Sequence, residues 1–176
     1  APRVTAASGL ALDGIDSAQR AAILEQLAVD AAAPGEFPAD TYFGGKALQR
    51  QALLLSVARE LGADELADQI ADRLEEELRS WTEADGCAQR TERCFAYNTA
   101  DAGMVGFTPA FGSEEFNDHH FHWGYFLFAG AVLAEYRPEV AADLAPVLDL
   151  LAADIAGAGG AEFPRLAGLR TRMRAL

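Results

Sequence analysis

Positive charge is scarce in this sequence. The chain of 176 residues has 14 Lys and Arg against 27 Asp and Glu, a formal net charge of -13. Nucleic acids and anionic membranes would repel such a chain, because both are negatively charged. No apolar run is long enough to span a bilayer. The composition favours one globular domain with a substantial core, acting on a neutral or cationic partner.

Cysteine is also scarce, with Cys87 and Cys94 as the two examples. They flank a short polar segment, so a local disulfide is compatible with an oxidising compartment. Two reduced, unrelated thiols fit the sequence equally well. A structural zinc site fits less well, because a second Cys or His pair at suitable spacing is missing.

Several catalytic motifs are missing as well. We find no strand–helix alternation, no nucleotide-binding loop, no nucleophile elbow and no HExxH pattern. Helical periodicity recurs instead and predicts an all-α fold of antiparallel helical hairpins. Ser17 is the expected N-cap of the first helix, and Pro146 is expected to break or kink the last one. The expected helices cover residues 17–32, 40–61, 64–84, 118–135 and 138–155.

The third expected helix has the clearest apolar stripe. Five large apolar residues are spaced four, four, four and three apart, as on one face of an amphipathic helix. Its connection to the second helix is so short that the two helices can only form an antiparallel hairpin. From 85 to 112 the periodicity stops, and a long loop rich in Gly and aromatic residues, with room for short strands, is expected. The stripe consists of Leu66, Ile70, Leu74, Leu78 and Trp81.

The stretch 112–128 concentrates the groups that can do chemistry. It contains all three histidines of the chain, at 119, 120 and 122, together with three carboxylates and six aromatic residues. If the segment from 118 onward is helical, Asp118, His122 and Tyr125 share one face. Asp118 then lies where the loop meets the helix, within reach of both solvent and a ligand.

Three interpretations of this cluster compete. Sugar hydrolases use two carboxyl groups, while aromatic rings stack on sugars and polar side chains bind hydroxyls. A chelating set of Asp118, His119 and His122 is a weaker alternative, because the two-histidine spacing of four is absent. A purely structural role is favoured for His120 alone, but three histidines beside an aspartate are costly to bury without use. The residues that match the first interpretation are Asn117, Asp118, His122, Trp123 and Tyr125.

The run Phe-Gly-Ser-Glu-Glu-Phe-Asn-Asp-His-His-Phe-His-Trp-Gly-Tyr-Phe-Leu (111–127) closely resembles the signature of glycoside hydrolase family 81, the endo-β-1,3-glucanases. Trp123 stands where a tyrosine is commoner. The segment 42–46, Tyr-Phe-Gly-Gly-Lys, resembles another stretch of that family, and 147–156 resembles the helix that follows the signature. Together these segments cover roughly 40–164 of what we expect to be one partial catalytic domain, 1–176.

The resemblance implies an (α/α)6 toroid, hydrolysis of internal β-1,3-glucosidic bonds with inversion, and no cofactor. No metal is expected either, because hydrolysis by two carboxyl groups needs no Lewis acid and the histidine spacing is poor for chelation. The resemblance identifies Asp118 as the general acid and Lys46 as a further sugar-binding candidate. The implied partner is a β-1,3-glucan, not nucleic acid or a membrane, and the expected location is extracellular. A non-catalytic β-glucan-binding or structural helical module is the alternative.

One departure from the family concerns the general base. The family signature is followed by a base-bearing helix that is not recognisable here, and the tail 167–176 departs from the family pattern with several arginines. A truncation or a shift of reading frame near Leu166 would explain this tail. Glu114 and Glu115 are the wrong carboxylates by the family pattern. We therefore expect a fragment that is inactive alone and that self-associates through exposed apolar helix faces, since five helices cannot close a twelve-helix ring.

Overall fold

The computed structural model describes residues 12, 14–157 and 159–163. It confirms the predicted helical class, with one small sheet added to the helices. Most of the expected N-terminal segment and the whole tail 167–176 lie outside the described residues. The elements are α1 (Ser17–Ala32), α2 (Phe43–Glu60), α3 (Asp64–Thr82), α4 (Gly86–Gln89), β1 (Cys94–Asn98), β2 (Gly103–Phe107), η1 (Ser113–Glu115), α5 (His119–Tyr136), η2 (Pro138–Val140) and α6 (Ala141–Ala156).

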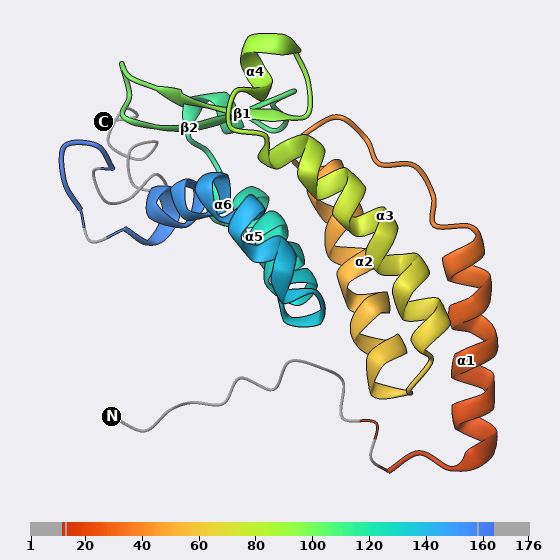
Figure 1. Ribbon diagram of the computed structural model, residues 1–176. Coiled ribbons are helices and arrows are strands. Elements are labelled where there is room, and N and C mark those ends of the chain that lie inside the picture. Colours follow the sequence, from red (N-terminus) through yellow and green to blue (C-terminus); the bar gives the residue numbers. More distant parts are fainter. Residues whose placement is uncertain (1–11, 13, 158, 164–176) are drawn as a thin grey trace, which may run out of the picture.

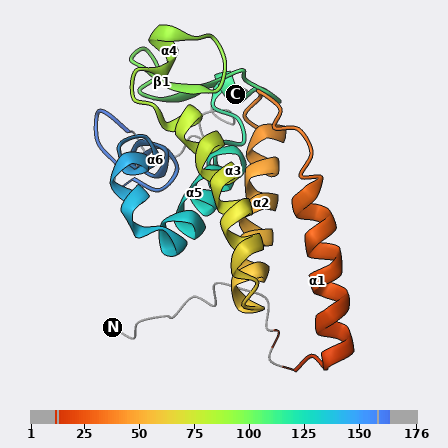
Figure 2. The ribbon, with the colours of Figure 1, turned by 45° about the vertical axis from the view of Figure 1, so that its right-hand side comes forward.

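The long helices form two layers, one of α2 and α3 with α1 beside them, the other of α5 and α6 (Figures 1 and 2). The predicted hairpin is present: α2 and α3 run side by side, joined by a tight turn in which Gly62 has a left-handed φ of 62°. A glycine adopts that conformation without steric cost. Helix α1 lies on the outer side of this hairpin, while α5 packs against α2 and α3 and α6 packs against α5. Within the part of the chain that the structure describes, no helix is long and apolar enough to cross a membrane.

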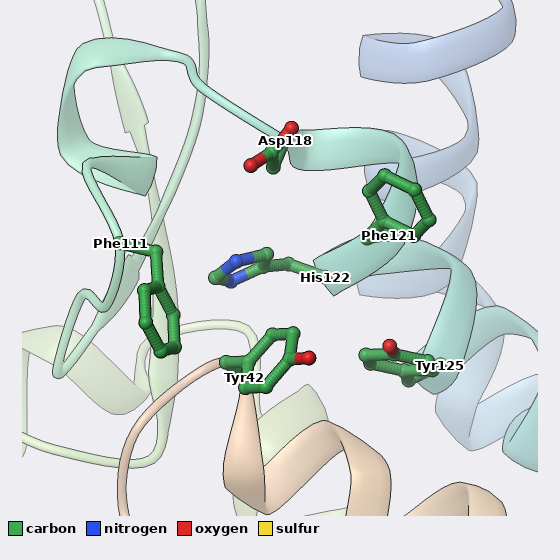
Figure 3. A pocket seen from close by; sticks show the side chains of 6 residues that line it. All are labelled: Tyr42, Phe111, Asp118, Phe121, His122 and Tyr125. Carbon is green, nitrogen blue, oxygen red and sulfur yellow. The ribbon is translucent and has the colours of Figure 1, made fainter.

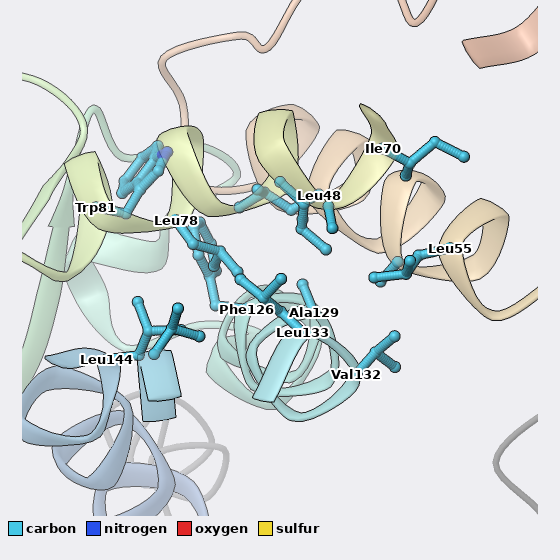
Figure 4. Close-up of a cluster of buried hydrophobic side chains, with 14 of the residues drawn as sticks. Leu48, Leu55, Ile70, Leu78, Trp81, Phe126, Ala129, Val132, Leu133 and Leu144 are labelled. Atoms are coloured by element: carbon cyan, nitrogen blue, oxygen red, sulfur yellow. The ribbon is translucent and has the colours of Figure 1, made fainter. Parts of the chain in front are cut away.

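Helix α5 occupies the centre of the core because its residues are apolar on nearly every side. Figure 4 shows Phe126, Ala129 and Leu133 of α5 facing the apolar stripe of the α2–α3 hairpin. The ring of Phe126 lies 4.9 Å from that of Trp81, between centroids, and 5.0 Å from that of Phe95. The predicted stripe of α3 is confirmed, since four of its five members are buried and Leu66 packs against the core.

Several predicted helix starts differ from the structure. The last helix was expected from 138, whereas the 3-10 turn η2 occupies 138–140 and α6 begins at Ala141. Asp16, not Ser17, caps α1: its carboxylate accepts a hydrogen bond from the Gln19 backbone N–H at 2.8 Å, and the Gln19 side chain accepts from the Asp16 N–H. This reciprocal capping box satisfies two backbone donors at once. Asp40 precedes α2 rather than opening it, and its carboxylate accepts from the backbone N–H of Phe43 at 2.7 Å.

Of the two effects predicted for Pro146, a break or a kink, the break does not occur, because α6 continues through Pro146 from Ala141 to Ala156. An interior proline removes one backbone hydrogen bond and costs about 3 kcal/mol. Buried side chains on both sides of it, Leu144 and Val147 close by and Leu151 further on, hold the helix against the core and offset that cost.

The region 85–112 is more regular than predicted. It contains the short helix α4 and an antiparallel hairpin in which Cys94 pairs with Phe107 and Asn98 with Gly103. The possibility of short strands is thus confirmed. Cys87 and Cys94 form a disulfide, which decides between the two possibilities that the sequence left open. The disulfide ties α4 to the first residue of β1.

We expect Phe126→Ala to destabilise the fold strongly, because it empties the centre of the aromatic core. Removal of a buried phenylalanine side chain costs about 3–5 kcal/mol. Phe121→Ala, on the exposed side of the same helix, is the matched control and should change stability by less than about 0.5 kcal/mol. Urea denaturation of both variants measures the two values. Equal losses would contradict the central place of Phe126.

Candidate active site

A pocket of about 290 Å³ lies where α5 begins (Figure 3). Two stretches far apart in the sequence build it: Tyr42, directly before α2, and the stretch 111–125, which runs from the loop before η1 into the first two turns of α5. The predicted face of Asp118, His122 and Tyr125 is confirmed, because all three side chains line the pocket. The lining residues are Tyr42, Phe111, Asp118, Phe121, His122 and Tyr125.

Asp118 is the N-cap residue of α5 and has a left-handed φ of 54°. Its backbone carbonyl accepts from the N–H groups of Phe121 and His122, at 2.9 and 3.1 Å, so the helix begins directly after it. Aspartate adopts this conformation more readily than most residues, and such positions cluster at functional sites. The side chain is thereby directed into the pocket instead of capping the helix.

Asn117 orients the Asp118 carboxylate. Its amide Nδ2 donates to Asp118 Oδ2 at 3.0 Å and to the carbonyl oxygen of Phe111 at 3.0 Å. Asn117 does not line the pocket. The sequence grouped it with the sugar-binding residues, whereas its bonds in the structure are to the neighbouring acid and to the loop.

His122 is buried but its ring faces the pocket, at the centre of Figure 3. Burial and the charge of His119 lower its pKa, against smaller opposing effects of Asp118 and Asp40. The ring is therefore neutral near pH 7. Its Nδ1 lies 2.8 Å from Thr41 Oγ1.

The hydroxyls of Thr41 and Ser113 indicate which ring nitrogen of His122 carries the hydrogen. The Ala110 backbone N–H donates to Ser113 Oγ at 3.3 Å, and Ser113 Oγ lies 3.3 Å from Thr41 Oγ1. If Ser113 donates to Thr41 and Thr41 donates to His122 Nδ1, each hydroxyl in this chain has an acceptor. The hydrogen of the neutral imidazole then resides on Nε2, which makes Nε2 a donor.

Two tyrosines close the other side of the pocket. The rings of Tyr42 and Tyr125 meet edge to face with centroids 6.0 Å apart. Burial, the charge of Tyr42 and a side-chain hydrogen bond with Tyr42 raise the pKa of Tyr125. The Tyr125 hydroxyl therefore stays protonated at neutral pH and can both donate and accept hydrogen bonds. Gly45 of α2 allows this approach, since a Cβ there would lie 3.1 Å from the Tyr125 side chain.

Trp123 and Lys46 lie outside the pocket. Trp123 is 0% exposed, and its indole N–H donates to Asp154 Oδ2 at 2.7 Å. One helical residue turns the side chain about 100° away from that of His122, toward the core. The sequence predicted that Trp123 contacts sugar directly; in the structure its side chain packs in the core and does not line the pocket. Lys46 is exposed, with its ammonium 5.3 Å from the Tyr42 ring centroid, on the rim of the pocket.

The alternative of a metal site is not supported by the placement of the histidines. Both ring nitrogens of His119 bind groups of the protein, and His120 is exposed. Among the described residues no group of three or more His, Cys, Asp or Glu side chains is arranged to hold an ion. The pocket lining contains one carboxyl group, that of Asp118, whereas Glu114 and Glu115 are exposed on η1.

A family model described as the glycosyl hydrolase family 81 C-terminal domain matches residues 15–169. This chain belongs to glycoside hydrolase family 81. A glucan endo-1,3-beta-D-glucosidase from Thermobifida fusca is 38% identical over 128 residues, which are 71% of this chain and 17% of the relative. One from Acetivibrio thermocellus is 35% identical over 137 residues, 76% of this chain and 17% of the relative.

A solved structure of the same family is also similar to this chain. The structure of a mutant family 81 glycoside hydrolase from Clostridium thermocellum matches with a TM-score of 0.72 and 32% identity, covering 88% of this chain and 22% of that one. The resemblance inferred from the sequence is confirmed. The match at 15–169 extends beyond the segment 40–164 in which that resemblance was found. The chain spans about a fifth or less of the proteins that it matches.

Three lining residues of this family 81 pocket were missed at the sequence level: Tyr42, Phe111 and Phe121. Tyr42 and Phe111 each open a segment that resembles the family, and Phe121 follows Asp118 by three residues, on the same side of the helix. Phe111 and Phe121 are 61% and 53% exposed. Their exposure, not their position in the sequence, distinguishes them from the buried aromatic residues nearby.

The lowered pKa of His122 predicts a pH-dependent stability. Below the ordinary pKa of 6.5 the unfolded chain takes up a proton on this histidine, whereas the buried native ring does not. Protonation therefore stabilises the unfolded state, and the free energy of unfolding decreases as the pH falls. Between about pH 7.5 and 5.5 the wild type should lose more unfolding free energy than His122→Gln. Urea denaturation at both pH values measures the difference. Parallel pH profiles would contradict burial of a neutral His122.

Proposed function

We propose that this chain supplies the proton donor, and part of the sugar-binding surface, of an endo-β-1,3-glucanase, with Asp118 as the donor. The observation that carries the proposal is a single carboxyl group at a loop–helix junction, in a pocket walled by aromatic rings. Family membership supports the reaction class, because curated relatives bear the name glucan endo-1,3-beta-D-glucosidase.

In this proposal Asp118 protonates the oxygen of the leaving sugar. A general acid must carry its proton on an oxygen that faces the substrate. Asn117 Nδ2 already donates to Asp118 Oδ2, which favours Oδ1 as the protonated oxygen. Asn117 thus acts on the substrate through Asp118 and not by direct contact.

The remaining lining side chains suit a neutral sugar chain. The exposed rings of Phe111 and Phe121 offer apolar faces on two sides of the pocket, as Figure 3 shows. Sugar rings stack on such faces through their C–H groups. Tyr125 and His122 Nε2–H supply hydrogen bonds for hydroxyls, and Lys46 extends the polar rim. A substrate without charge is consistent with the net charge of -13.

An inverting mechanism needs a second carboxyl group about 6.5–9.5 Å from the first, with room for a water between them. Asp118 alone provides a carboxyl group in the described pocket. We therefore place the general base on residues outside those described, across a cleft of which this pocket is one wall. In that arrangement the helices belong to an (α/α)6 toroid, and neither a cofactor nor a metal is required.

We also propose an extracellular location. The disulfide between Cys87 and Cys94 supports it, because structural disulfides persist in oxidising compartments.

We expect Asp118→Asn, in the full-length protein that carries this chain, to lower kcat on laminarin by on the order of 10²–10⁴-fold. The KM should change little, because the lost proton acts in the transition state. Glu114→Gln, an exposed carboxylate of the same loop, is the matched control and should retain activity. Reducing-end release measures both. Near-normal turnover of Asp118→Asn would rule out Asp118 as the donor.

The 176-residue chain by itself should bind β-1,3-glucan without cleaving it, since its pocket has one carboxyl group. Phe111→Ala should weaken binding of laminari-oligosaccharides about tenfold, or about 1.4 kcal/mol, through loss of a stacking surface. Phe107→Ala removes an exposed ring outside the pocket and is the control. Calorimetry and reducing-end assays give both results, and light scattering tests the expected self-association.

Two outcomes would change the proposal. Robust cleavage by the isolated chain, abolished by Glu114→Gln or Glu115→Gln, would locate the base on η1. Binding without cleavage by the full-length protein would favour the alternative of a non-catalytic β-glucan-binding module.

A further inference from the structure

Two buried titratable side chains have no part in the proposed reaction. His119, the first residue of α5, is 1% exposed, and Asp154, in the last turn of α6, is 7% exposed. Neither lines the pocket. Burying charged or polar groups is costly unless their hydrogen bonds are satisfied, so their bonds show what they hold in place.

The Asp154 carboxylate connects α6 to two other elements, β2 and α5. Oδ1 accepts from the Met104 backbone N–H of β2 at 3.1 Å. Oδ2 accepts from the Trp123 indole N–H of α5 at 2.7 Å and lies 2.5 Å from His119 Nδ1. Gly103 makes room for this arrangement, because a Cβ there would lie 2.7 Å from Oδ1. Each carboxylate oxygen of Asp154 thus accepts from one N–H group, and His119 Nδ1 is the third nitrogen beside it.

The other ring nitrogen of His119 also faces an acceptor. Its Nε2 lies 2.7 Å from the Ser113 carbonyl oxygen, which has no hydrogen to donate. An ionised carboxylate can only accept hydrogen bonds, so opposite an ionised Asp154 the Nδ1 atom donates as well. Both nitrogens then carry hydrogen, which makes the ring an imidazolium paired with the Asp154 carboxylate. Its positive charge is also one of the causes that lower the pKa of the neighbouring His122.

The bond from His119 to Ser113 closes the short loop that contains Asp118. It joins the first residue of η1 to the first residue of α5, and between them Phe116 and Asp118 have left-handed φ values of 65° and 54°. The Ser113 hydroxyl, on the same residue, contacts Thr41 and through it His122. The side chain of His119 is thus bonded to the residue that connects the loop of Asp118 with the hydroxyls behind His122.

We propose that His119, held as an imidazolium between Asp154 and the Ser113 carbonyl, is a positioning residue that fixes Asp118 and His122 in the pocket. Asp154 is its counter-ion and connects it to α6 and β2. The catalytic consequence rests on the proposed function of Asp118. The charge state and the closed loop are properties of the fold and are independent of it.

The charge state is tested first, on the wild-type chain. Long-range ¹H–¹⁵N spectra at pH 7 should show two protonated ring nitrogens for His119 and one for His122. The exposed His120 provides the solvent-accessible reference. A neutral ring for His119, with one nitrogen lacking hydrogen, would overturn the proposal whether or not the protein cleaves glucan.

The positioning role is tested in the full-length protein with His119→Gln and Asp154→Asn. Displacement of the acid by about 1 Å should lower kcat on the order of 10- to 100-fold, with a smaller change in KM. The matched controls are His120→Gln, the exposed neighbour on α5, and Asp149→Asn, an exposed carboxylate on α6. Both controls should retain wild-type kcat.

The outcomes separate this inference from the proposed function. Unchanged kcat in folded His119→Gln, with activity lost in Asp118→Asn, would overturn the positioning role and leave the acid assignment intact. Loss in both, with an imidazolium signature in the wild type, supports the two together. If neither positioning variant folds, the wild-type spectra decide: a slowly exchanging His119 Hε2 supports the bond to Ser113, and a rapidly exchanging one overturns it.

Discussion

The burial of α5 is the constraint on which the rest of the structure depends. A helix that is apolar on nearly all sides must be covered by neighbours, and α2, α3 and α6 provide that cover. Rings of Trp81, Phe95 and Phe126 interlock at its middle. The helix is thereby fixed in position and rotation, and its polar first turn lies at the edge of the core.

That first turn divides three histidines among three environments. Successive helical residues are rotated by about 100°, so His119 faces α6 and η1, His120 faces solvent and His122 faces the pocket. The buried pair of His119 and Asp154 couples the loop before α5 to the helix after it. The site is therefore held by the core packing itself, and the small hairpin contributes a backbone donor to the same carboxylate.

The helical class, the α2–α3 hairpin and the family could be predicted from the sequence. Periodic apolar spacing identifies a helix wherever one face must be buried, as in the stripe of α3. The signature at 111–127 identified the family because it is long and specific. Pro146 shows the limit of such local rules, since tertiary contacts of Leu144 and Val147 outweigh a local helix-breaking preference.

The sequence by itself determined which residues share a helix face, and so grouped Asp118, His122 and Tyr125. Tertiary structure alone decided which aromatic side chains are exposed: Trp123 is buried, whereas Phe111 and Phe121 border the pocket. Tertiary structure also brings Thr41, 81 residues earlier in the sequence, and the adjacent Tyr42 into contact with His122. The physical reason is that burial depends on what packs against a side chain, and packing between distant segments has no signal in local spacing.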